Sequence, residues 1–131
     1  MTTIPHTTLL DTLVDCRALI TPPENFTKNA YAKDTIGIPV SATDKSATCF
    51  CLLGSAMRVI GYNPNCRKHV DGNQYVMYSE VVVQLQRQLR LTTDISDEYM
   101  GVARYSDSST HEEVMTLLDN TIARLKLEAQ P

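Results

Sequence analysis

The stretch TCFCLLGSAMRVIG, residues 48–61, decides how this chain is expected to fold. Apolar side chains go nearly all the way round a helix drawn through it, which is typical of a helix buried in the middle of a domain. We predict that this helix runs from Ser46 or Ala47 to Ile60. Ser46 is a good N-cap, and Gly61 suits the position directly after the last turn.

Small side chains form a stripe along this predicted helix: Ala47, Cys51, Gly54 and Ser55. A glycine inside a helix costs about 1 kcal/mol relative to alanine. A close approach of another backbone to Gly54 would explain why the chain accepts that cost.

Helical spacing of apolar residues predicts three more helices, one before this central helix and two after it. They cover about residues 7–20, residues 74–91 and the chain after Thr110. Thr110 and Glu113 form the capping box of the last helix. We therefore predict a mainly α single domain, residues 1–131, with four main helices and two long ordered loops. A four-helix bundle and an irregular α fold with a short β-hairpin both fit this pattern.

The first long loop, residues 27–45, follows a short helical turn expected at residues 23–26 and includes an extended piece at residues 36–40. Its apolar residues are expected to pin it to the core: Ala30, Tyr31, Ile36, Ile38 and Val40. Asp34 lies in this loop, and Asp107 lies in the second one, residues 92–109. A loop carboxylate either binds a ligand or caps a turn, and the second role is the commoner.

Composition places the chain among ordinary soluble domains. It has 131 residues, of which 43% are hydrophobic and 21% charged. No apolar run approaches the roughly 20 residues that span a bilayer, and the first residues do not resemble a signal peptide. We therefore expect a cytoplasmic protein with no membrane contact, whose four cysteines are free thiols.

Three interpretations of the cysteines are open. Cys49, Cys51, Cys66 and His69 supply zinc-type ligands, but a helix through residues 49–51 would turn the first two thiols about 200° apart. The spacing is also unusual for zinc, so no metal is expected.

Cys51 alone, near a helix N-terminus, could be a nucleophile with His69 or His111 as its base. Its apolar neighbours favour the third interpretation, a small buried core residue that is chemically inert. The sequence therefore predicts no catalytic residue.

Charge is segregated along the chain although its net value is only −3. Residues 58–93 carry five basic and two acidic side chains, and residues 94–131 carry three basic and eight acidic ones. The basic middle is the candidate binding surface, for an acidic partner or for phosphate. Its members are Arg58, Arg67, Lys68, Arg87 and Arg90, with Tyr62 as a nearby anchor. The alternatives without a binding role are solvated helix faces for the basic residues and a tyrosine that covers the core.

Five short motifs follow one another along the chain: Phe26, AYAKD at 30–34 with Gly37 and Pro39 after it, FCLLGSA at 50–56, YSD at 105–107 and THEEV at 110–114. Their order resembles a family of uncharacterised small domains from actinobacteria and phages. In that pattern Trp is usual at Phe26, Phe50 and Tyr105, and Asn is usual at Ser106. The resemblance implies a small, mostly helical fold and no established activity.

The resemblance also suggests how the motifs are used. The AYAKD loop, the start of the CLLGSA helix and the YSD segment are expected to meet around the small-residue stripe. Asp34 and Asp107 would then bind backbone amides across this junction.

We expect from these observations a non-enzymatic interaction protein, encoded by a phage or mobile element, that needs no cofactor. It would bind a host or phage protein or another macromolecule, for example as an inhibitor of a bacterial defence system. The alternatives are a small enzyme that uses Cys51 and a weak nucleic-acid-binding accessory protein. The oligomeric state is left open.

Overall fold

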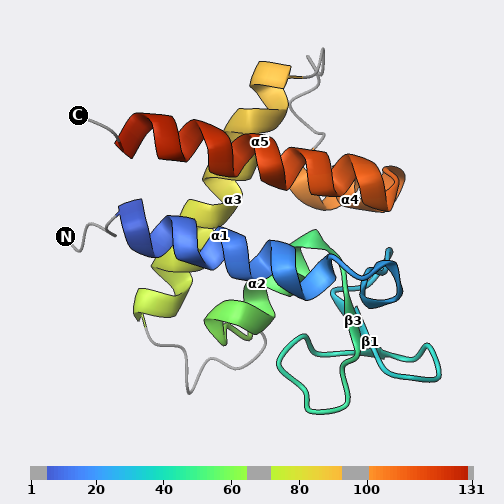
Figure 1. Cartoon of the computed structure of the whole chain (residues 1–131). Coiled ribbons are helices and arrows are strands. Elements are labelled where there is room, and N and C mark those ends of the chain that lie inside the picture. Colours follow the sequence, from blue (N-terminus) through green and yellow to red (C-terminus); the bar gives the residue numbers. More distant parts are fainter. Residues whose placement is uncertain (1–5, 65–71, 93–100, 130–131) are drawn as a thin grey trace.

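The computed structural model describes residues 6–64, 72–92 and 101–129. Its longest helices are α1 (His6–Ile20), α3 (Gly72–Thr92) and α5 (His111–Ala129). In Figure 1, α1 and α5 lie side by side and run in opposite directions, while α3 crosses behind both. Leu13, Leu85 and Leu118, one from each helix, are fully buried in a shared core.

The shorter helix α2 (Leu52–Ile60) is the inner helix of the fold. Every residue from Leu52 to Met57 is buried, and α2 packs against α1, α3 and a short helix, α4 (Val102–Ser108). It ends at Gly61, whose φ of 82° lies in the left-handed region that glycine adopts without strain. The prediction of a buried central helix is confirmed.

A small sheet lies at the C-terminal end of α1 (Figure 1). A 3₁₀ turn (Pro23–Asn25) leads into it, followed by β1 (Ala32–Lys33), β2 (Pro39–Val40) and β3 (Cys49–Phe50). The strands are antiparallel in the order β2-β1-β3, and Ala32 pairs with both Val40 and Phe50. The fold is therefore mainly α with a small sheet, as the sequence predicts.

One boundary and one element differ from the prediction. The central helix begins at Leu52, because Cys49 and Phe50 pair with β1 as a strand. Ser46 does not cap it; its hydroxyl and its N–H both donate to Asp44 Oδ1 in a tight turn. The second irregular segment also contains a helix that was missed, α4 (Val102–Ser108).

The start of α5 follows the prediction closely. The Thr110 N–H donates to Glu113 Oε1 at 2.9 Å, and the Glu113 N–H donates to Thr110 Oγ1 at 3.1 Å. Hydrogen bonding of the carboxylate by the backbone N–H and the side chain of Thr110 lowers the pKa of the Glu113 carboxyl. The capping box is therefore formed with both of its bonds.

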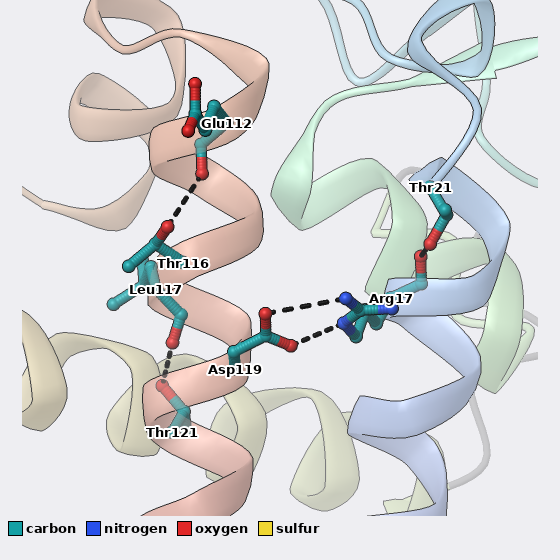
Figure 2. Close-up of polar contacts among 7 residues, drawn as sticks. All are labelled: Arg17, Thr21, Glu112, Thr116, Leu117, Asp119 and Thr121. Carbon is teal, nitrogen blue, oxygen red and sulfur yellow. Dashed lines mark hydrogen bonds and ion pairs between the residues drawn. The ribbon is translucent and has the colours of Figure 1, made fainter.

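An ion pair between Arg17 and Asp119 joins α1 to α5 on the molecular surface, as Figure 2 shows. The two side chains are 40% and 51% exposed, so the pair adds little stability. The buried leucines between the two helices are therefore the main source of their attachment.

Candidate functional site

Segments far apart in the sequence meet at the N-terminus of α2. The Cys51 N–H donates to the Tyr31 carbonyl at 3.1 Å. A Cβ atom at Gly54 would lie 1.7 Å from the same carbonyl oxygen, so only glycine fits there. The close backbone approach predicted at Gly54 is confirmed, and its partner is the loop that precedes β1.

Helix α4 closes the other side of this junction. Ser106 is fully buried, and its Oγ accepts the Leu52 N–H at 3.2 Å. Asp107 Oδ1 accepts the Asn29 N–H at 2.8 Å, across 78 positions in the sequence. The three motif segments therefore meet, and Asp107 binds a backbone amide across the junction.

Asp107 itself lies in α4 and not in a loop, contrary to the prediction. Asp34 does not reach across the junction either. Its Oδ1 accepts the N–H groups of Ile36 and Ile38, at 3.0 and 2.9 Å, so it fixes the turn between β1 and β2.

A pocket of about 230 Å³ opens where these segments meet, and we call it the α2 pocket. It is lined by Asn29, Ala30, Tyr31, Cys51, Ala103 and Asp107. Loop, helix start and α4 each contribute residues, so the pocket exists only in the folded chain. Among these lining residues, Asp107 carries a negative charge on its carboxylate.

Cys51 caps α2 and is not poised as a nucleophile. Its Sγ accepts the Gly54 N–H at 3.3 Å, and the residue is buried. Burial raises the pKa of the thiol, and the negative charge of Asp107 raises it further. A thiolate is the reactive form, so both effects disfavour nucleophilic attack by Cys51 near neutral pH.

The proposed bases do not support such an attack. His111 is only partly exposed, lies within 2.6 Å of the Ile20 carbonyl through Nε2, and packs against the Phe26 ring. His69 lies outside the described residues.

The geometric argument against zinc rested on a helix that does not exist at Cys49. In the structure Cys49 is in β3 and Cys51 is extended, and alternate residues of an extended chain face the same side. Cys66 and His69 lie outside the described residues. Within residues 6–64, 72–92 and 101–129, no three His, Cys, Asp or Glu side chains are placed to hold a metal ion.

The hairpin formed by β1 and β2 presents apolar side chains to solvent. Tyr31, Ile36 and Ile38 are 48%, 77% and 51% exposed, and we call these three residues the hairpin surface. The prediction that they pin the loop to the core was wrong; Val40 does pack against it. The pattern Asp34-Thr35-Ile36-Gly37, with Gly37 at a φ of 87°, was the available indication of a turn that projects outward.

The basic residues do not gather on one described surface. Arg58 braces the loop before β3, since its Nη1 donates to the carbonyls of Ala42 and Asp44 at 3.2 and 2.7 Å. Its guanidinium also lies 5.7 Å from the centre of the Phe50 ring. Arg58 is therefore engaged within the fold.

Tyr62 is buried and stacks on Tyr78, so it is not an exposed anchor. Arg87 and Arg90 are exposed on α3, where they line a shallow depression of about 460 Å³ with Val82, Val83 and Gln86. Arg67 and Lys68 lie outside the described residues.

Comparison with known proteins gives a family for this chain. The model of a family of unknown function, DUF6197, matches residues 4–124. The chain belongs to this family. No curated protein and no solved structure matches it. The resemblance inferred from the order of motifs is thus confirmed at the level of a family of unknown function.

None of the helices in the described ranges is long and apolar enough to cross a lipid bilayer.

Proposed function

We propose that this chain is a non-enzymatic interaction protein that binds a partner protein through the hairpin surface. The observation that supports this proposal is the exposure of Tyr31, Ile36 and Ile38 within eight residues of chain. Ile36 and Ile38 lie at the tip of the hairpin, whereas the strand register places Tyr31 on the opposite face from Ile38. Exposed apolar side chains are common singly, whereas a contiguous apolar patch marks a contact surface, so Ile36 and Ile38 carry the proposal. Tyr31 also lines the α2 pocket, at the other end of β1 from Ile36 and Ile38.

The hairpin is held in one shape before any partner arrives. Besides the two bonds to its carboxylate, Asp34 donates its N–H to the Ile38 carbonyl, and its own carbonyl accepts the Gly37 N–H, both at 3.0 Å. A surface already in its bound conformation loses less entropy on binding. The turn therefore favours a specific contact over a loose apolar one.

The form of this function that we favour is a cytoplasmic protein encoded by a phage or another mobile element. It would bind a host or viral macromolecule, for example as an inhibitor of a bacterial defence system. The small size of the chain supports this form.

A pull-down from host lysate tests the proposal, with capture at low and moderate salt and identification by mass spectrometry. Wild type is compared with Ile36→Ser/Ile38→Ser, which removes two apolar groups from the hairpin surface. Val83→Ser is the matched control, because Val83 is similarly exposed but lies on α3.

We expect one stoichiometric protein that is retained by the control and lost by the hairpin variant. A protein captured equally by all three would contradict the proposal. Nucleic acid released by moderate salt would instead favour binding through Arg87 and Arg90.

A further inference from the structure

The α2 pocket has the size and charge of a site for one side chain. We propose that it receives the cationic side chain of a lysine or arginine of the bound partner protein. This inference rests on the proposed function and names the chemistry that the partner must present.

The charge of the pocket favours a cation. Asp107 uses Oδ1 to hold the Asn29 N–H. In the part of the chain that the structure describes, no donor is bonded to Oδ2 and no lysine or arginine pairs with the carboxylate. One carboxylate oxygen therefore lies at the pocket without a partner from the fold.

An anion would find few donors here. The N-terminus of a helix normally offers free N–H groups to anions. In α2 the Leu52 N–H is bonded to Ser106 and the Gly54 N–H to Cys51. With these donors occupied and Asp107 nearby, the pocket disfavours phosphate and carboxylate groups.

The remaining walls suit the aliphatic stem of a long basic side chain. Ala30 and Ala103 are small, and Tyr31 is half exposed beside them. A guanidinium or ammonium group gains further stabilisation from a tyrosine ring close by. The volume of about 230 Å³ accommodates one such side chain.

Titration of the ¹⁵N-labelled chain with Nα-acetyl-arginine amide tests this inference by NMR. The neutral isostere Nα-acetyl-citrulline amide is the ligand control. We expect saturable shifts of the Asn29, Ala30 and Ala103 amides with the arginine probe, and affinity for the citrulline probe that is weaker by roughly tenfold.

Asp107→Asn keeps an oxygen that can accept the Asn29 N–H while it removes the charge. We expect it to weaken the arginine probe by roughly tenfold and to leave the melting temperature nearly unchanged. Asp11→Asn removes the same charge from exposed α1 and should have no effect on binding. Absent saturation, or equal affinity for both probes, would overturn the inference.

The pull-down separates this inference from the proposed function. If Asp107→Asn captures the partner as well as wild type does while the hairpin variant does not, the pocket receives no essential cation and the interaction function still stands. Loss of capture in both variants supports both.

Discussion

Gly54 is the residue at which the fold depends most on the absence of a side chain. Its missing Cβ leaves room for the Tyr31 carbonyl, which is backbone and cannot rotate away. We expect Gly54→Ala to lower the free energy of unfolding by about 2 kcal/mol or more, through the forced separation of the loop from α2. Denaturant unfolding measures this change.

Gly72→Ala is the matched control, because a Cβ at Gly72 meets nothing within 4 Å among the residues that the structure describes. Alanine has the higher helix propensity, so this variant should be as stable as wild type or slightly more so. Equal effects of the two substitutions would refute the close contact at Gly54.

The buried thiols provide a second test at the scale of single residues. Burial raises the pKa of Cys16 to about 12, and it also raises the pKa of Cys51. Labelling by iodoacetamide at pH 7.5, followed peptide by peptide in the mass spectrometer, should be slow at both until the chain is unfolded. Fast labelling of Cys51 in the folded protein would revive the interpretation of an active nucleophile.

Asp34 acts on the hairpin alone. Asp34→Ala removes the acceptor of the Ile36 and Ile38 amides, so we expect those amides to exchange with solvent faster. The melting temperature should change little, because the turn projects from the core. Unchanged exchange at both amides would show that the carboxylate does not hold the turn.

Chemistry at single residues was partly predictable. Gly54 lowers the stability of its helix, and this cost indicated a close backbone contact. The residue types at Thr110 and Glu113 indicated the two bonds of the capping box. Both signals are local in the sequence. The exposure of Ile36 and Ile38 was not predicted, because hydrophobic type alone does not say which way a turn projects. A bond from Asp107 to a backbone amide across the junction followed from the order of motifs, but its partner, Asn29, was not predicted.

At the scale of elements, the N-terminus of α5 is the most directly testable. Thr110→Ala removes one bond of the capping box, and we expect the free energy of unfolding to fall by about 1 kcal/mol. Thr116→Ala is the control, because Thr116 is exposed on the same helix and its hydroxyl donates to the Glu112 carbonyl (Figure 2). If the two variants lose equal stability, the cap contributes nothing particular.

The long helices were predicted to within about two residues at the ends that could be compared, because their apolar spacing and stop residues are strong. The start of α2 was missed because its capping residue is a cysteine, and the thiol is not a usual cap. Pairing with β1 then decides that Cys49 and Phe50 are a strand. Helix α4 was missed because only Val102 and Ser106 of its residues are buried, too few to show a period.

At the scale of the whole molecule, the mainly α class and the membership of a family of unknown function were both predictable. The α2 pocket was not, since its lining residues come from three segments brought together only by tertiary packing. The described part of the basic middle is divided for a similar reason. Arg58 and Tyr62 are used inside the fold, and what remains exposed on α3 is a separate surface.

Site-specific photo-crosslinking in host lysate tests most directly whether the hairpin surface is where a partner binds. One protein carries benzoylphenylalanine in place of Ile36, and a second carries it in place of Val83, beside Arg87 and Arg90. We predict a discrete cross-linked protein from position 36 and none from position 83. Cross-links from position 83 alone, or equal ones from both positions, would contradict the assignment of the hairpin surface as the binding site.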